Sequence, residues 1–346
     1  MKKGVRVKDI IIGGGSRVTV QSMTTTDTRD VGATIEQIKR LEDVGCDIVR
    51  VAILDSDAAA CLSKIKKSIK VPLVADIHFD YRLAIESIKN GADKIRINPG
   101  NIGSVDRVKK VILVAKKYGV PIRIGVNSGS LSKDIVEKYG VTPRAMVQSA
   151  LENIRILEDL DFSDIVLSLK ASDVRKTIEA YQLIDEKSSY PLHLGVTESG
   201  TKWIGTIKSS IGIGSLLERG IGDTIRVSLT SDPEDEVRTG IEILKALGLR
   251  KSGVQFISCP TCGRCKINLI EIANKVQDGL KDVDKDIKLA IMGCAVNGPG
   301  EAKEADIGIA CGDGEALLFK KGKIIRKIPG DRIVEELLRE IKEGVK

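Results

Sequence analysis

The chain has 346 residues, of which 42% are hydrophobic and 30% are charged, and it contains 34 glycines. This length exceeds the size at which one hydrophobic core keeps growing, so the sequence predicts a large domain followed by a smaller one. The formal net charge of +7 suits an anionic partner. Because the lysines are dispersed and lack interleaved aromatics, a small phosphorylated ligand is favoured over nucleic acid.

Export and membrane insertion are not expected. The apolar run before the first glycines, Ile10 to Ile12, is too short for a signal peptide, and no stretch approaches membrane-spanning length. The seven cysteines are odd in number and unevenly spaced. We therefore expect reduced thiols, metal or redox chemistry, and a cytoplasmic protein.

The first 230 residues repeat one pattern. Eight short runs rich in β-branched residues begin at Val18, Asp47, Pro72, Lys94, Pro121, Asp164, Pro191 and Thr224. Amphipathic segments of helix length lie between them, such as 32–45, and one follows the last run at 232–248. This pattern predicts an α/β fold, a (β/α)8 TIM barrel, over residues 1–250. A doubly wound open sheet could also hold eight strands, but no G-x-G-x-x-G turn follows the first run.

The pattern changes at a polar joint near residues 250–253. Strand-like runs follow at 254–258, 288–293 and 305–310, with a hairpin at 317–328. Helix-like segments occupy 267–280 and 331–345. We predict a small α+β domain over residues 251–346.

Polar residues stand two apart at the ends of five predicted barrel strands: Asp76 and His78, Arg96 and Asn98, Arg123 and Asn127 across Gly125, Ser168 and Lys170, Arg226 and Ser228. Arg50, Thr197 and Glu198 add to this ring. Residues two apart on a strand share a face, and barrel enzymes keep their reacting groups at these strand ends.

Any single member of the ring could equally be a buried salt bridge, but a convergent set is harder to explain that way, because each unpaired buried charge is costly. The cations outnumber the carboxylates, which predicts a ligand with several negative charges, such as a diphosphate. With only two histidines, a metal site built on imidazole is not expected. His78 is a site candidate beside Asp76, and His193, at a strand start, is expected to be structural.

A second candidate site is cysteine-rich. Cys259, Cys262 and Cys265 have the C-x2-C-x2-C spacing that begins a ferredoxin iron–sulfur motif, but the x3-C-P that completes this motif does not follow. Cys294 follows a predicted strand, and Glu301 lies in the loop after it. Spacing alone leaves open a structural zinc site made of Cys259, Cys262, Cys294 and either Cys265 or Cys311. A radical S-adenosylmethionine barrel is a further alternative, but that class uses C-x3-C-x2-C inside the barrel.

Five segments resemble the 4-hydroxy-3-methylbut-2-enyl diphosphate synthase family of the non-mevalonate isoprenoid pathway: VQSMTTTDTRD, ADIHFDYRLA, KIRINPGNIG, CPTCGR and MGCAVNGPGEAKEADIGIA. They span both predicted domains and fit the bacterial two-domain form. The resemblance implies a [4Fe-4S] cluster held by Cys259, Cys262, Cys294 and Glu301. Cys265 falls outside this set, and we expect Cys46, Cys61 and Cys311 to be packing residues.

The resemblance also implies a reaction. In it, 2-C-methyl-D-erythritol 2,4-cyclodiphosphate is opened and reduced to 4-hydroxy-3-methylbut-2-enyl diphosphate with electrons from flavodoxin or ferredoxin. Our hypothesis assigns substrate binding to Arg50, Arg96, Asn98, Arg123, Asn127, Lys170, Thr197 and Ser228. Proton transfer falls to Asp76, His78 or Glu198. We favour Glu198, because a carboxylate beside a dianionic ligand retains its proton more readily.

Connectivity predicts the assembly. The eighth helix of the barrel would carry the chain from the mouth back to the base, roughly 20 Å away. The cluster domain is then tethered at the wrong end for its own barrel. We expect a head-to-tail homodimer in which each cluster domain covers the partner's barrel, as the resemblance also implies.

Overall fold

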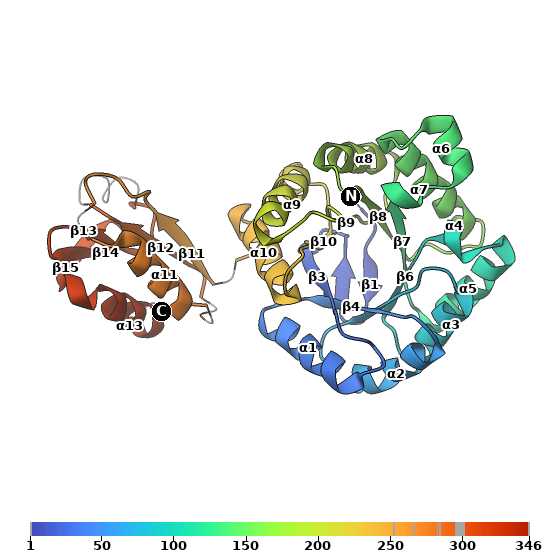
Figure 1. Cartoon of the computed structure of the whole chain (residues 1–346), viewed down its shortest axis with the longest axis horizontal. Coiled ribbons are helices and arrows are strands. Elements are labelled where there is room, and N and C mark those ends of the chain that lie inside the picture. The colour runs from blue at the N-terminus through green and yellow to red at the C-terminus, as the bar shows by residue number, and fades with distance from the viewer. Residues whose placement is uncertain are drawn as a thin grey trace. The chain divides into compact units, whose positions relative to one another are not determined.

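A computed structural model describes residues 2–251, 253–265, 267–281, 283, 285–294 and 302–344. The chain divides into two compact units, Met1–Arg250 and Lys251–Lys346 (Figure 1).

A ring of parallel strands forms the centre of the first unit: β3 (Thr19–Met23), β4 (Ile48–Ala52), β5 (Leu73–Asp76), β6 (Lys94–Ile97), β7 (Ile122–Asn127), β8 (Ile165–Lys170), β9 (His193–Leu194) and β10 (Thr224–Ile225). Their order in the sheet is β8-β7-β6-β5-β4-β3-β10-β9. A parallel bridge between Leu167 and Leu192 connects β8 with the start of β9, which closes the ring. The predicted (β/α)8 barrel is confirmed.

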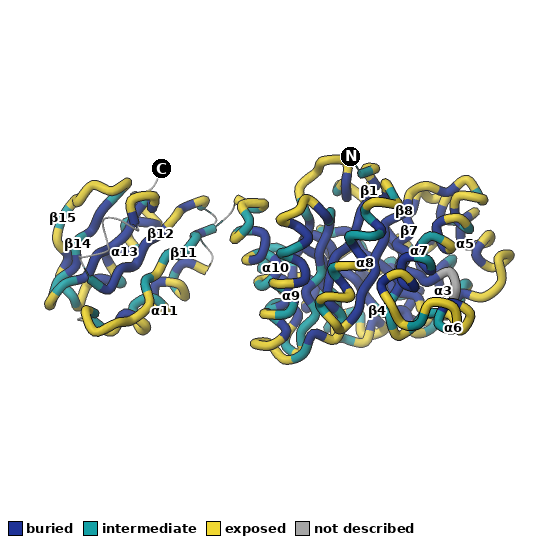
Figure 2. Tube along the Cα trace, turned by 90° about the horizontal axis from the view of Figure 1, so that it is seen from above, coloured by how far each residue is buried: buried dark blue, intermediate teal, exposed yellow. Residues whose placement is uncertain are grey.

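Helices surround the strands: α1 (Val31–Asp43), α2 (Ser56–Lys67), α3 (Tyr81–Lys89), α5 (Val105–Tyr118), α7 (Pro143–Glu158), α8 (Val174–Lys187), α9 (Lys202–Leu217) and α10 (Pro233–Ala246). The short α4 (Pro99–Ile102) and α6 (Lys133–Tyr139) are additions to this ring. Figure 2 shows the strands and the inner helix faces buried. Several helices begin at an aspartate whose carboxylate accepts a first-turn N–H, as Asp30, Asp55 and Asp173 do. This N-cap fixes where the chain leaves the barrel mouth.

The base of the barrel is closed by the N-terminal hairpin of β1 (Val5–Val7) and β2 (Ile10–Ile12). Its apolar side chains pack with Ile48, Val74 and Val166 from the barrel strands. This hairpin was not predicted, because its apolar run suggested only a segment too short for export. The hairpin leaves the opposite, carboxyl ends of the strands as the accessible end of the barrel.

The last two barrel strands are shorter than the runs that predicted them. Only two residues of each pair as regular strand, although Arg226 N still donates to Leu194 O at 3.0 Å. Beyond this pair the chains come very close, since a Cβ on Gly195 would lie 2.5 Å from Arg226 O. That approach breaks the regular ladder at the mouth.

The second unit holds one mixed sheet in the order β11-β12-β13-β14-β15. Its strands are β11 (Val254–Ser258), β12 (Ile287–Met292), β13 (Ile307–Cys311), β14 (Glu315–Lys320) and β15 (Lys323–Pro329). The first three are parallel, and the last two form an antiparallel hairpin. Helices α11 (Leu269–Gly279) and α13 (Ile333–Gly344) pack on a common core with the sheet. The predicted α+β elements are all present.

Candidate active site

A cavity of about 200 Å³ opens at the carboxyl ends of the barrel strands. It is lined by Arg50, Asp76, His78, Arg96, Arg123, Asn127, Ser168, Lys170, Thr197, Arg226 and Ser228. These residues come from β4 to β8 and from the segments that follow β5, β9 and β10. All members of the polar ring predicted from strand alternation, except Asn98 and Glu198, therefore line one cavity.

The cavity carries an excess of positive charge. Five cations line it, and the carboxylates in contact with them are Asp76 and, behind Arg226, Glu236. Asp76 receives Arg96 Nη1 at 3.3 Å, His78 Nε2 at 3.4 Å and Arg50 Nε at 3.8 Å. Arg123 and Lys170 form no ion pair with any residue that the structure describes, and the five cations outnumber the two carboxylates, so the site is suited to a multiply charged anion.

Arg123 is the most buried of these cations, with 1% of its surface exposed. Its Nε and Nη1 have no hydrogen-bond partner within the described part of the chain. Unpaired guanidinium donors at the bottom of a cationic cavity are available to an oxyanion ligand.

The electrostatics of the cavity follow from burial and crowding. Burial, Arg123 and Arg226 lower the pKa of Lys170 well below its ordinary value. Burial, opposed by Asp76, lowers the pKa of Arg50 to about 10. Burial alone would raise the pKa of Asp76, but Arg50, His78 and Arg96 outweigh it and hold that pKa far below its usual range. An incoming anion would relieve the repulsion among the cations.

Two glycines make room for the cations. A Cβ on Gly125 would lie 2.4 Å from Arg96 Nε, and a Cβ on Gly195 would lie 2.6 Å from Lys170 Nζ. Neither glycine has a positive φ, so space and not backbone conformation requires them. The long side chains of Arg96 and Lys170 cross the barrel over these gaps.

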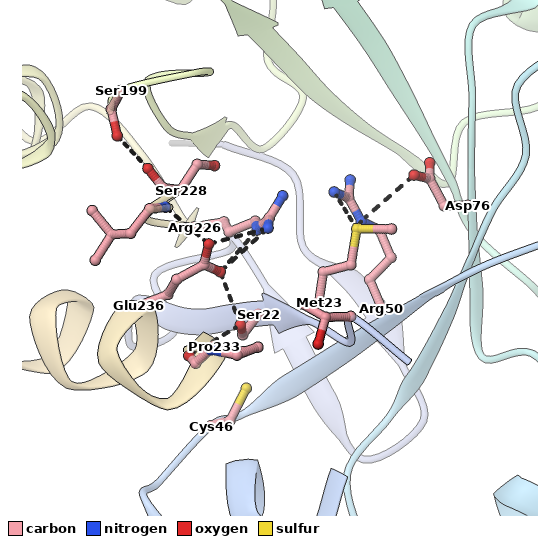
Figure 3. A network of polar contacts seen from close by, with 12 residues as sticks. Ser22, Met23, Cys46, Arg50, Asp76, Ser199, Arg226, Ser228, Pro233 and Glu236 are labelled. Carbon is pink, nitrogen blue, oxygen red and sulfur yellow. Dashed lines mark hydrogen bonds and ion pairs between the residues drawn. The ribbon is translucent and has the colours of Figure 1, made fainter. Parts of the chain in front are cut away.

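Two networks fix the rim of the cavity (Figure 3). Arg50 directs Nε and Nη2 at the thioether of Met23, at 3.2 and 3.0 Å. Arg226 donates to the carboxylate of Glu236, which also accepts from Ser22 Oγ at 3.0 Å. Arg226 was among the residues predicted at the strand ends, whereas Met23, Ser22 and Glu236 were not predicted. Met23 alone carried a signal, since it shares the inward face of its strand with Gln21.

Glu198 lies beside the cavity and not in it. It lines a second space of about 270 Å³, together with Ser199, Glu236 and others, and Arg226 and Ser228 form the wall common to both spaces. Glu198 has a φ of +51°, an uncommon conformation for a residue with a side chain. The neighbouring hydroxyl of Ser199 donates to Ser228 O, which ties this turn to the segment after β10.

The other predicted site residues divide clearly. Asn98 is buried after β6 but does not line the cavity. Asp76, His78, Asn127, Thr197 and Ser228 all line it. His193 lies fully buried on β9, away from the cavity lining, as expected of a structural residue.

The cysteine-rich site lies at one edge of the small sheet. Cys259 follows β11 and Cys294 follows the neighbouring parallel strand β12, so both lie at the same end of adjacent strands. The amide of Gly293 donates to Cys259 Sγ at 3.1 Å. Cys262 is exposed in the loop after β11, and Glu301 lies outside the described residues.

The donor chemistry of this edge fits an iron–sulfur cluster. Thiols supply the ligands, and a backbone amide aimed at a cysteine sulfur is the kind of hydrogen bond that tunes such clusters. Within the described ranges, no three cysteine, histidine or acidic side chains are gathered as a metal site. Cys265 packs against Gly293, whose Cβ would lie 2.8 Å from Cys265 Sγ.

Two of the remaining cysteines are buried, as expected of packing residues, and Cys61 is partly buried against the barrel core. Cys46 is buried between β3 and β4, and burial raises its pKa to about 12. Cys311 is buried at the end of β13 in the small core. Across the described residues, no helix combines the length and apolar character needed to cross a membrane.

Comparison with known sequences gives two family matches. The family described as "GcpE TIM-barrel domain" matches residues 2–241, and "GcpE protein C-terminal domain" matches residues 255–343. A protein of Ruminiclostridium cellulolyticum is 63% identical over 342 residues, which cover 99% of this chain and 97% of that protein. One of Clostridium acetobutylicum is 64% identical over 338 residues, 97% of each chain. Both are called 4-hydroxy-3-methylbut-2-en-1-yl diphosphate synthase (flavodoxin).

Two solved structures are similar to this chain over 72% of its length. The sialic acid synthetase of Leptospira borgpetersenii has a TM-score of 0.51 at 12% identity and covers 72% of this chain and 91% of its own. The dihydropteroate synthase of Yersinia pestis has a TM-score of 0.50 at 14% identity, with 72% and 98% covered. At these identities the likeness concerns the fold and says nothing of the reaction.

Proposed function

The chain belongs to the GcpE family, and from that premise we propose that it is an oxidoreductase of the non-mevalonate isoprenoid pathway. It opens and reduces 2-C-methyl-D-erythritol 2,4-cyclodiphosphate to (E)-4-hydroxy-3-methylbut-2-enyl diphosphate. The observation that carries this proposal is the cationic cavity at the barrel mouth, which matches a diphosphate in charge and position. The relatives' names specify flavodoxin as their electron donor, and ferredoxin is a second candidate.

The cavity residues bind the substrate. Arg96, Arg123 and Lys170 hold the diphosphate oxygens from below, where two nitrogens of Arg123 have no hydrogen-bond partner in the described ranges. Arg50 and Ser228 contact it from the rim, while Asn127 and Thr197 orient it. Asn98, buried after β6, supports the site from outside the lining. Because the cations are already in place, binding requires little rearrangement.

Proton transfer falls to the acidic residues. Glu198 borders the space next to the diphosphate site, where the carbon chain of the substrate would extend. We assign to its carboxyl group the proton that accompanies loss of one substrate hydroxyl as water. Asp76 holds Arg50, Arg96 and His78 in place, and His78 is the alternative proton donor.

A [4Fe-4S] cluster is held by Cys259, Cys262, Cys294 and Glu301. When bound, it supplies electrons to the substrate one at a time. Reduced thiols and an iron–sulfur cofactor suit the cytoplasm. The backbone amide of Gly293 at Cys259 Sγ supports this edge of the small unit as the ligand site.

Metal analysis tests the cofactor. The protein is purified without oxygen, and iron, sulfide and zinc per chain are measured with the visible spectrum. We expect about four irons per chain, loss of iron in Cys294→Ala and Glu301→Ala, and retention in Cys265→Ala as the matched cysteine control. Zinc without iron would instead support a structural zinc domain on a phosphate-binding barrel.

The active assembly is a head-to-tail homodimer. Exposed apolar side chains surround the barrel mouth: Leu54 after β4, Phe79 after β5 and Trp203 at the start of α9, each about 70% exposed or more. Helix α10 starts at the mouth, and its 14 residues carry the chain away from it. In the homodimer, the small unit of the partner covers this rim.

Complementation tests the dimer. Cys294→Ala damages the cluster, and Glu198→Gln damages the barrel. If each site combines one chain's barrel with the other chain's cluster, mixed dimers of the two inactive variants regain turnover at one of their two sites. If both parts come from the same chain, the mixture stays inactive and the dimer proposal is wrong.

A further inference from the structure

Glu236 is a buried carboxylate outside every role assigned so far. It lies in the first turn of α10 and is 4% exposed. Its two oxygens accept from Arg226 Nε and Nη2 at 3.2–3.3 Å, from Ser22 Oγ at 3.0 Å and from Leu229 N at 3.0 Å. Donors from β3 and from the segment around β10 therefore meet on one side chain.

The partners of Glu236 fix the guanidinium of Arg226 in a single orientation. Nε and Nη2 are occupied by the carboxylate, and Figure 3 shows a further nitrogen directed away from Glu236. Arg226 lines the anion cavity and also the neighbouring space that contains Glu198. Its orientation therefore affects the boundary between the two spaces.

The other cations of the cavity are held differently. Arg50 and Arg96 share Asp76, and Arg123 has unpaired donors among the described residues. A two-pronged contact between arginine and carboxylate gives directional control that a distant charge does not. The amide of Leu229 adds a second constraint, because it fixes the backbone that follows Arg226.

We propose that Glu236 is a positioning residue that aims Arg226 at the bound diphosphate at the boundary of the two spaces. This inference rests on the proposed function of the cavity as a diphosphate site. Glu236 itself does not contact the substrate; it acts through Arg226, with Ser22 and Leu229 N as its supports.

The direction in which Glu236→Gln changes anion affinity distinguishes a positioning role from a purely electrostatic effect of the carboxylate. Glu236→Gln removes a negative charge next to an anion site, so Coulomb attraction alone would tighten anion binding. If Glu236 positions Arg226, the same substitution weakens binding. We expect the dissociation constant of inorganic pyrophosphate for the full chain, measured by calorimetry, to rise about tenfold, as for loss of one good charged contact.

A double-mutant cycle completes the test. Glu236→Gln in an Arg226→Gln background is expected to change the affinity less than twofold, because the residue on which Glu236 acts is gone. Ser22→Ala, which leaves the charge in place, should weaken binding moderately. Glu336→Gln is the matched control: this glutamate is 3% exposed and paired with Arg326 at 2.5 Å, but belongs to the small unit.

The outcomes are distinct. Binding that is unchanged or tighter in a folded Glu236→Gln protein overturns the positioning role and leaves the diphosphate site intact. A tenfold loss that persists in the Arg226→Gln background also overturns it. If the parent chain does not bind pyrophosphate, the proposed diphosphate site itself fails. Thermal unfolding of each variant identifies any that do not fold.

Discussion

A single methyl group at Gly125 should disable the cavity without touching a charged residue. Gly125 is buried on β7, between Arg123 and Asn127, and lacks a positive φ, so alanine can adopt its backbone conformation. The added Cβ would lie 2.4 Å from Arg96 Nε and 2.9 Å from Nη2. Arg96 is 8% exposed, so its side chain cannot simply swing into solvent. It must leave its place over the glycine.

The magnitude follows from what Arg96 loses. Its 3.3 Å contact with Asp76 and its proposed contact with a bound anion are both charge-assisted. A hydrogen bond to a charged group contributes about 1.5–3 kcal/mol, which corresponds to roughly 10- to 150-fold in affinity. Overpacking of the barrel interior costs about 1–3 kcal/mol of stability. We therefore expect Gly125→Ala to fold, with a lower melting temperature and weak anion binding.

Calorimetry with inorganic pyrophosphate measures the loss of anion affinity, and thermal unfolding measures the loss of stability. Gly214→Ala is the control, because Gly214 lies on α9 and an added Cβ would meet no packing neighbour within 4 Å among the residues that the structure describes. That substitution should leave affinity unchanged and raise stability by about 0.4–1 kcal/mol. Parent-like affinity in Gly125→Ala would refute the close fit between Arg96 and the backbone.

Three further predictions concern charge, proton transfer and thiols. Burial and neighbouring cations depress the pKa of Lys170 in the free protein, and a bound anion should raise that pKa. At a pH between the pKa of the free protein and the pKa of the complex, binding of the anion is therefore accompanied by uptake of a proton on Lys170. Pyrophosphate affinity should fall as the pH rises from the lower of these pKa values to the higher. Calorimetry in buffers of different ionisation enthalpy measures this uptake, and the difference between parent and Lys170→Met isolates the lysine; equal uptake in both would exclude it. Glu198→Gln should keep pyrophosphate affinity, since Glu198 lies outside the anion cavity, yet lower turnover by about 10²-fold or more with a loaded cluster; full turnover would remove Glu198 as proton donor. In cluster-free protein, iodoacetamide should label exposed Cys262 first and Cys46 and Cys311 last, because burial raises the pKa of both buried thiols to about 12. Peptide mass spectrometry reads the order, and early labelling of Cys46 or Cys311 would contradict its packing role.

The barrel and its cavity were predictable because strand alternation is a local rule. Asp76, Arg96 and Lys170 each stand two residues from another polar residue on the same strand face, so the sequence alone places them inward at the mouth. Local spacing could not reveal Glu236. Within DPEDEV it looks like one more acid in the first turn of a helix. Only the closure of the sheet between β10 and β3 brings it to Arg226 and Ser22.

The N-terminal hairpin was missed for a related reason. Val5, Val7 and Ile12 look like an isolated apolar segment, and their partners lie on barrel strands far along the chain. Gly13, with φ of +80°, lets the chain turn where a Cβ would lie 2.3 Å from Lys3 O. Such a contact depends on tertiary packing, which outweighs local preference here.

The same strands provide both the stability of the barrel and its charge. Ile48 lies in the apolar base layer, and two residues further on the same face β4 presents Arg50 to the cavity. β5 repeats this step from Val74 to Asp76. Burying an aliphatic side chain contributes about 1.5–3 kcal/mol to the free energy of unfolding. The apolar base layer and the N-terminal hairpin therefore help to offset the repulsion between the cations at the mouth. Because a strand is stiff over two residues, a well-packed base also holds the charged ends in register. A polar substitution in the base layer should therefore reduce anion affinity as well as stability, although it lies far from the ligand.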